Sequence, residues 1–265
     1  MKKPHKGATL LLRDALVFSE EKTYPTHQPV VETDHNVYVK TQVKDLVFRF
    51  LAGNFFQNNP FILPLMVDRV IDASIVPNIH GNDMSHLIDC YCGSGLFCIS
   101  AASKFDICVG IEVNERAIEE AKVNARLNHI GNCKFIAASA EAIFESTELI
   151  MLENSSQDVT SSQNIKVKDF PRETTVVVLD PPRKGCSPEF LEQMFVFRPQ
   201  RIVYMSCDPA TQARDAKCIA ANGYDIISIE PIDLFPQTRQ LSEMTLFNIF
   251  LLLFMKTYYL CFVAI

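Results

Sequence analysis

One cysteine in this sequence, Cys207, lies at a position where a protein of alternating strands and helices could carry a nucleophilic thiol. It lies just past the short apolar run 202–205, after Ser206, and precedes the turn-forming pair Asp208-Pro209. This order sets the thiol at the carboxyl edge of a sheet, where α/β proteins build their sites. A cysteine after a strand is more often a small buried hydrophobic residue, so the interpretation depends on the motifs that accompany it.

A glycine-rich turn and an acidic strand end upstream indicate a nucleotide-like ligand. The segment 87–97 reads as a strand, a turn containing Gly93 and Gly95, and the start of a helix. Glycines let the backbone approach such a ligand closely. The next apolar strand, 107–111, ends in Glu112, whose carboxylate could accept hydrogen bonds from both hydroxyls of a ribose.

A second carboxylate follows another strand. The run 176–179 is fully apolar and leads into Asp180, Pro181 and Pro182. Because prolines cannot continue a strand ladder, Asp180 is expected to project from the strand end. Asp180 and Cys207 therefore converge on one crevice beside the glycine turn.

Together these motifs resemble the S-adenosylmethionine-dependent RNA (uracil-5-)-methyltransferases, and within that family the tRNA enzymes. Four blocks carry the resemblance in the family's order and spacing, namely 52–59, 89–97, 179–185 and 206–215. It implies an α/β fold of the Rossmann-like class I methyltransferase type with a mostly parallel sheet. It also implies S-adenosylmethionine as cofactor, tRNA as substrate, and 5-methyluridine in the T loop as product.

The family chemistry that this resemblance implies begins with a thiolate. Uracil C5 is a poor nucleophile, but addition of a thiolate to C6 turns C5 into an enolate-like carbon that can take a methyl group. Cys207 matches the nucleophile. Only the thiolate attacks, and Arg214 and the strand-end amides are the candidates to stabilise it; Arg214 is also expected to contact the substrate.

Further positions match the family's binding contacts. Asp180 falls between methyl donor and uracil, with a catalytic and a cofactor-binding role. Gln57, Tyr91 and Glu112 match cofactor contacts, whereas Leu96 stands where some relatives have a polar residue. Phe55 matches an aromatic ring that stacks on an extruded base, and its alternative is ordinary packing in the core.

The proton acceptor that the resemblance implies is out of register. Relatives use a glutamate after a Phe-Pro turn, and counting from Phe235-Pro236 places that position on Ser242, one residue before Glu243. One residue reverses the side-chain face of a strand, but a β-bulge would restore it. Glu243 is therefore expected to act as the base if a bulge absorbs the shift. The alternative is a solvated carboxylate and lost turnover.

Alternating strand-like and helix-like runs predict the α/β class. The expected strands are 87–89, 107–111, 134–137, 176–179, 202–205 and 226–229. A helix is expected over 115–128, with Ala117, Ala121 and Ala125 on its packing face and Gly131 closing it.

The domain division follows the resemblance, which covers roughly residues 46–247. Residues 1–45 are expected to be a remnant of an inserted or central domain, and the amino-terminal RNA-binding domain of relatives is not expected. Residues 248–265 form an apolar tail of unclear role. Lys256 would cost about 3 kcal/mol at a bilayer centre, so a membrane anchor is the less favoured interpretation.

The composition limits which metals and partners this chain is expected to bind. Nine cysteines without a CxxC pair argue against a zinc or iron–sulfur site and favour reduced thiols inside a cell, so no metal is expected. The net charge of −6 predicts weak RNA affinity for this chain. Basic residues nevertheless accompany the strand-end motifs of the crevice, at Arg183, Lys184, Arg201, Arg214 and Arg239.

Two other functions remain open. The chain could be a catalytically idle RNA-binding or RNA-folding protein of the same fold. It could also be an amino-group nucleic-acid methyltransferase, since Asp180-Pro181-Pro182 at a strand end can hold an exocyclic amine. The latter chemistry needs no cysteine nucleophile.

Overall fold

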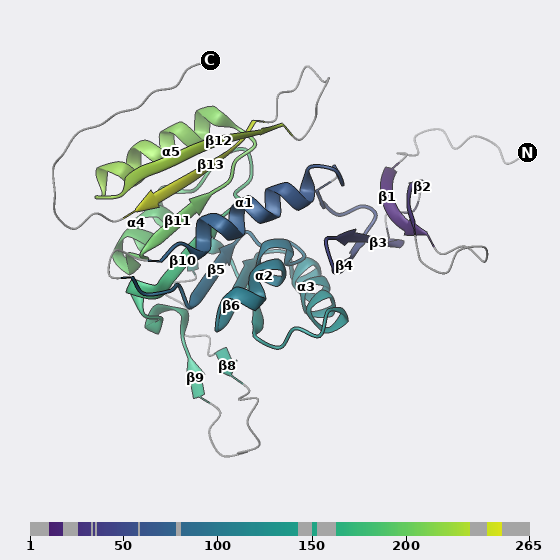
Figure 1. Cartoon of the computed structure of the whole chain (residues 1–265), viewed down its shortest axis with the longest axis horizontal. Coiled ribbons are helices and arrows are strands. Elements are labelled where there is room, and N and C mark those ends of the chain that lie inside the picture. The colour runs from purple at the N-terminus through teal and green to yellow at the C-terminus, as the bar shows by residue number, and fades with distance from the viewer. Residues whose placement is uncertain are drawn as a thin grey trace, which may run out of the picture.

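A seven-stranded sheet forms the centre of the molecule, in the order β12-β13-β11-β10-β5-β6-β7 (Figure 1). The computed structural model describes residues 11–17, 26–32, 34, 36–57, 59–77, 81–142, 150–152, 163–233 and 243–250. The strands of this sheet are β5 (His86–Cys90), β6 (Ile107–Glu112), β7 (Cys133–Ala137), β10 (Thr175–Leu179), β11 (Arg201–Tyr204), β12 (Asp225–Asp233) and β13 (Glu243–Phe250). Five neighbouring strands, from β11 to β7, run parallel, and β13 lies antiparallel between β11 and β12.

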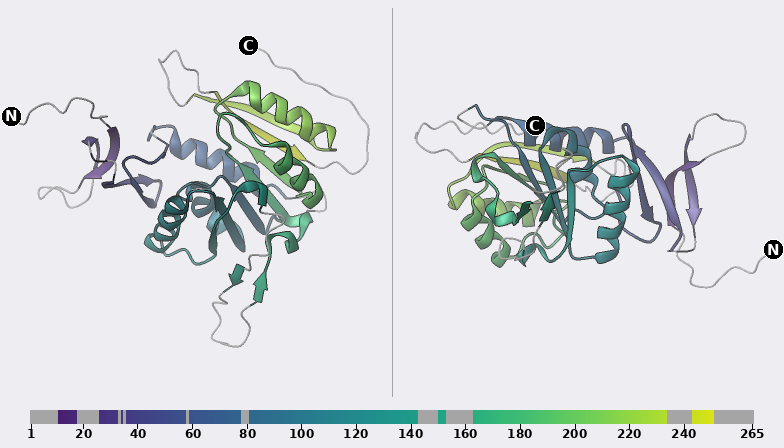
Figure 2. Two further views of the ribbon diagram at one scale, coloured as in Figure 1. Left: turned by 180° about the vertical axis from the view of Figure 1, so that it is seen from behind. Right: turned by 90° about the horizontal axis from the view of Figure 1, so that it is seen from below.

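All six expected strands are present, and the α/β prediction is confirmed. Helices cover both faces of the sheet (Figure 2). They are α1 (Leu63–Ile75), α2 (Leu96–Ala101), α3 (Glu115–Leu127), α4 (Pro188–Phe197) and α5 (Pro209–Ala221). In β10, Val176 and Val178 pack into the core beneath α1 and α2, while Val177 and Leu179 pack beneath α4 and α5. A strand buried on both faces needs a continuous apolar run, as β10 has.

Helix α3 forms where the sequence predicts it. The Asn114 side chain accepts hydrogen bonds from two amides of the first turn, and Ala121 and Ala125 are buried. The prediction that Gly131 closes the helix is wrong. His129 already takes the left-handed conformation, with φ of 57°, so the chain reverses before Gly131.

Three short antiparallel pairs lie outside the main sheet. They are β1 (Leu11–Val17) with β2 (Thr26–Glu32), β3 (Tyr38–Val43) with β4 (Leu46–Leu51), and β8 (Ile150–Leu152) with β9 (Gln163–Ile165). The β3–β4 hairpin binds α3 through two amide side chains. Asn124 accepts from the Arg49 amide at 2.7 Å and donates to its carbonyl at 3.0 Å, and Asn128 bonds to both backbone groups of Val47.

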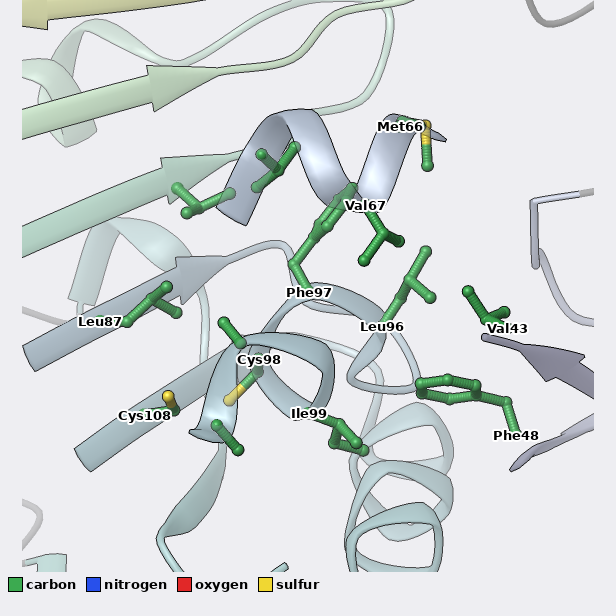
Figure 3. Packing of buried hydrophobic residues seen from close by; sticks show 14 of the residues in the cluster. Val43, Phe48, Met66, Val67, Leu87, Leu96, Phe97, Cys98, Ile99 and Cys108 are labelled. Carbon is green, nitrogen blue, oxygen red and sulfur yellow. The ribbon is translucent and has the colours of Figure 1, made fainter. Parts of the chain in front are cut away.

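The same hairpin contributes to the core. Figure 3 shows Val43 and Phe48 reaching toward Leu96 of α2, while Phe97 points toward α1, which contributes Val67 to the same cluster. The expected domain boundary at residue 46 thus falls between the two strands of one hairpin. The division into 1–45 and 46–247 stays a prediction.

The expected start of the apolar tail, at residue 248, falls inside a strand. Strand β13 continues to Phe250, three residues into the segment that the sequence assigns to the apolar tail, and residues 251–265 lie outside the described part. In the described part of the chain, no helix is long and apolar enough to span a membrane.

Gly110 in β6 has no room for a side chain, and replacing it by alanine is expected to destabilise the fold. A Cβ atom would lie 2.7 Å from Cδ1 of Phe135 and 2.8 Å from Sγ of Cys92. We expect Gly110→Ala to lower the free energy of unfolding by about 1–3 kcal/mol, measured by urea denaturation. At Gly131 a Cβ would meet nothing within 4 Å, so Gly131→Ala is the control, with a change within about 0.5 kcal/mol. Equal effects of the two changes would contradict this account.

Candidate active site

A cavity of about 930 Å³ opens at the carboxyl ends of the parallel strands. It lies where β5 and β10 adjoin and the winding of the sheet changes direction, the position at which open α/β sheets bind ligands. Six of the predicted site residues line it, namely Phe55, Gln57, Tyr91, Glu112, Asp180 and Cys207. Arg214 lies outside this lining.

Cys207 occupies the turn between β11 and α5 and is partly exposed. The turn is held by Ser206, whose Oγ accepts from the Asp208 amide at 3.0 Å. Asp208 in turn caps α5 by accepting from the Ala210 and Thr211 amides. These bonds fix the backbone beside the thiol, which faces the same cavity as Asp180.

Asp180 follows β10 and is a half-buried acid of the cavity. Burial raises the pKa of its carboxyl group to about 7. Near neutral pH the group therefore populates both a protonated form, which donates a hydrogen bond, and an ionised form, which only accepts. The protonated form could donate to the edge of a base, and the ionised form could bind a cationic ligand.

The glycine turn between β5 and α2 presents its backbone to the cavity. Tyr91, Gly93 and Gly95 all have positive φ, of 65°, 53° and 88°. At Gly95 a Cβ would lie 2.9 Å from Cδ1 of Ile99, in a backbone conformation that residues with a Cβ rarely adopt. Glu112 holds the turn, because its Oε2 accepts from the Gly93 amide at 3.2 Å.

The sequence leaves two roles open for Phe55, stacking on a base and packing in the core. In the structure, the neighbouring Phe56 packs in the core and Phe55 does not. Phe56 is buried and stacks on Phe50, with ring centroids 4.4 Å apart. Phe55 is 75% exposed at the cavity wall. The core-packing interpretation of Phe55 is therefore wrong, and its ring is free to meet a flat ligand.

Two basic residues are placed differently from the expectation that they border the crevice. Arg201 starts β11 at the opposite end of the sheet, where it is buried and donates to the carbonyls of Ala73 and Ser74 at the end of α1. Arg214 bonds to Asp215 and to backbone carbonyls after β10. Its contact with a substrate stays a prediction, and Arg239 lies outside the described residues.

Glu243 is the first residue of β13, opposite Asp233 of β12. Its side chain and residues 234–242 lie outside the described part. The ladder of β12 and β13 has one irregularity, between Ile226 and Ser228, at the end far from Glu243. A bulge that restores the register of Glu243 stays a prediction.

The residues after β7 were missed by the sequence reasoning. Ser139 and Glu141 line the cavity. The Glu141 carboxylate accepts from the hydroxyls of Ser139 at 2.8 Å and Ser187 at 3.0 Å, and a hydrogen bond from its own backbone amide lowers its pKa. The sequence does contain a signal for these residues. The run 134–137 is an expected strand of a mostly parallel sheet, and its carboxyl end must therefore lie at the same edge of the sheet as the carboxyl ends of the other strands.

Three buried thiols cluster away from the cavity. The sulfur atoms of Cys98, Cys108 and Cys133 lie within 4.8 Å of one another, and none of these residues lines the cavity. The expectation that the chain binds no metal stays a prediction.

Comparison with known proteins identifies the family of this chain. A family model described as tRNA (Uracil-5-)-methyltransferase matches residues 26–248. A curated tRNA (uracil(54)-C(5))-methyltransferase of Schizosaccharomyces pombe is 35% identical over 244 residues, which is 90% of this chain and 41% of that protein. Its counterpart in Saccharomyces cerevisiae is 37% identical over 217 residues, 80% of this chain and 31% of that protein. The chain thus spans less than half the length of these relatives.

A solved structure shows the same fold. The crystal structure of Pyrococcus abyssi tRNA (uracil-54, C5)-methyltransferase in complex with S-adenosyl-L-homocysteine superimposes with a TM-score of 0.59 at 23% identity, over 90% of this chain and 50% of that one. The predicted Rossmann-like methyltransferase fold is confirmed. With the family match over residues 26–248, the chain belongs to the tRNA (uracil-5-)-methyltransferase family.

Proposed function

We propose that this chain transfers a methyl group from S-adenosylmethionine to C5 of a uridine in the T loop of tRNA, through a covalent bond between Cys207 and C6. The observation that carries the proposal is one cavity lined by a thiol, a half-buried carboxyl group and a glycine turn from adjacent strand ends. Membership of the family and the names of the curated relatives support the substrate class.

The cavity residues fit the cofactor. The Glu112 carboxylate stands at a strand end beside the glycine turn, where a ribose would lie. Gln57 and Tyr91 would contribute further contacts, and Asp180 would lie against the sulfonium. The exposed ring of Phe55 would stack on the uracil base.

S-adenosylmethionine, when bound, supplies an electrophilic methyl group, and breaking of its S–CH3 bond leaves S-adenosylhomocysteine. Cys207 adds as thiolate to C6, so that the electrons of the C5–C6 double bond become available at C5 for bond formation with that methyl group. A base then removes the C5 proton, the double bond re-forms, and the Cys207 thiolate leaves. Glu243 is the proposed base.

Release of tritium from tRNA labelled at uridine C5 tests the proposal. Release into water should require both S-adenosylmethionine and Cys207. The exposed Cys218 on α5 provides the control, since Cys218→Ala should release tritium at the wild-type rate. No release by the wild type would favour an idle RNA-binding protein, and any multiple turnover would exclude that alternative.

The raised pKa of Asp180 predicts that cofactor affinity depends on pH. Below the pKa of about 7 the carboxyl group is neutral, and above it the ionised form attracts the positive sulfonium. Affinity for S-adenosylmethionine should therefore rise about tenfold from about pH 6 to 8, whereas affinity for the neutral product S-adenosylhomocysteine should change little. Calorimetry on the wild type and Asp180→Asn checks this, because the variant should lose the pH dependence. A pH dependence that persists in Asp180→Asn would assign it to another group.

A further inference from the structure

We infer that Arg214 and Asp215 are positioning residues, which fasten the segment after Asp180 to the helix after Cys207. They would thereby hold the carboxyl group and the thiol at a fixed separation across the cavity. The inference rests on the proposed function, since it concerns the geometry of the same reacting groups.

Asp215 is the centre of the arrangement. It lies in α5 and is only 2% exposed. Its Oδ2 accepts from the Tyr204 hydroxyl at 2.7 Å and from the Cys186 amide at 2.8 Å, and its Oδ1 accepts from Nε of Arg214 at 2.8 Å. A buried carboxylate is costly unless it is paired and hydrogen-bonded. Asp215 thus joins β11, α5 and the segment after β10.

Arg214 and Thr211 extend this contact along the segment after the two prolines. The guanidinium Nη2 of Arg214 donates to the carbonyls of Lys184 at 3.0 Å and Cys186 at 3.2 Å. The Thr211 hydroxyl donates to the Arg183 carbonyl at 3.0 Å. All these donors lie in the first half of α5, which begins two residues after Cys207.

Gly185 allows the close approach. Its φ is 76°, and a Cβ there would lie 2.5 Å from Oδ2 of Asp215 and 2.6 Å from Nη2 of Arg214. The backbone therefore packs directly against the charged pair. Because a displacement of about 1 Å in a reacting group can cost about 10²-fold in rate, loosening this contact should slow the chemical step.

This role differs measurably from phosphate binding. A phosphate contact made by Arg214 would show in the affinity for tRNA and in its salt dependence. A positioning role would instead lower the rate at saturating tRNA. The Arg214→Lys variant separates the two roles, because lysine keeps the positive charge but cannot reproduce the fork of donors that Arg214 uses.

The test uses Arg214→Lys and Asp215→Asn, with Lys217→Ala as control for loss of one positive charge from the exposed face of the same helix. The substrate is tRNA carrying 5-fluorouridine. After thiolate addition and methyl transfer, the fluorine at C5 cannot leave as a proton would, so the adduct accumulates. We measure the rate of denaturant-stable adduct formation, the Kd for tRNA at two salt concentrations, the Kd for S-adenosylmethionine, and the melting temperature.

We expect adduct formation to slow at least about tenfold in Arg214→Lys and in Asp215→Asn. The Kd for tRNA and its salt dependence should stay at wild-type values in Arg214→Lys, and Lys217→Ala should keep the wild-type rate. The double variant should be no slower than the slower single one, since both changes break one network. Because Arg214 is partly exposed, with 56% of its side chain accessible, Arg214→Lys decides the test if Asp215→Asn does not fold.

A wild-type adduct rate in Arg214→Lys would overturn the inference, as would an Arg214→Ala variant that only weakens tRNA binding and flattens its salt dependence. Absence of adduct in the wild type would instead refute the proposed function, so the two failures are distinguishable.

Discussion

Replacing Cys207 by alanine is expected to lower the rate of methylation at least about 10³-fold, the scale of loss when a nucleophile is removed. Without addition of a thiolate to C6, C5 of uracil stays too weak a nucleophile to accept the methyl group. The affinity for S-adenosylmethionine should stay within about twofold of the wild type, because a partly exposed cysteine can be shortened without disturbing the glycine turn. Methyl incorporation into tRNA and calorimetry give the two readouts.

Cys218→Ala is the matched control, since it removes an exposed thiol from α5, the helix that follows Cys207. It should retain full activity. A Cys207→Ala variant that methylated at the wild-type rate would contradict the covalent mechanism and favour the amino-group alternative, in which Asp180-Pro181-Pro182 binds an exocyclic amine.

Loss of the Glu112 carboxylate is expected to weaken binding of S-adenosylmethionine about 10²-fold. Hydrogen bonds to a charged group contribute about 1.5–3 kcal/mol each, and a ribose would offer two. Glu112 also holds the Gly93 amide at 3.2 Å and the Asn114 amide at 2.9 Å, so Glu112→Ala should loosen the turn itself. Calorimetric titration of the variant measures the loss.

The product S-adenosylhomocysteine should lose affinity equally in Glu112→Ala, because it has the same ribose; this separates the role of Glu112 from that of Asp180. Glu119→Ala is the control, since Glu119 is exposed on α3 and pairs with Lys122 at 2.8 Å. Unchanged cofactor binding in Glu112→Ala would argue against every methyltransferase interpretation of the cavity.

The strands could be predicted because their signals are local. An apolar run such as 176–179 has to lie in a sheet covered on both faces, and the prolines after Asp180 end it. Residue types at strand ends then predicted the cavity, because parallel strands place their carboxyl ends at one edge. Phe55 needed the structure, since two adjacent phenylalanines carry the same local signal and only packing distinguishes the exposed ring from the buried one.

Predictions from the sequence were wrong where a residue's contact partner lies far away along the chain. Arg201 looks like any basic residue beside a strand, but it pairs with carbonyls of α1 more than a hundred residues earlier. Gly131 looked like a helix terminator because glycine favours positive φ, yet His129 takes that conformation, and Asn128 bonds across to Val47 of the hairpin.

The sequence by itself determined the α/β class, the order of the strands along the chain and the identity of the thiol, carboxyl and glycine residues that meet at one edge. These features follow from apolar runs and turn residues that act over a few positions. The tertiary structure decided which of the two adjacent aromatic rings is exposed and which is buried, and which charged groups are paired within the protein. It placed Arg214 on Asp215 and on the segment after Asp180. Such pairings depend on which elements pack together, and hydrophobic burial of whole faces selects that packing before any single polar contact forms.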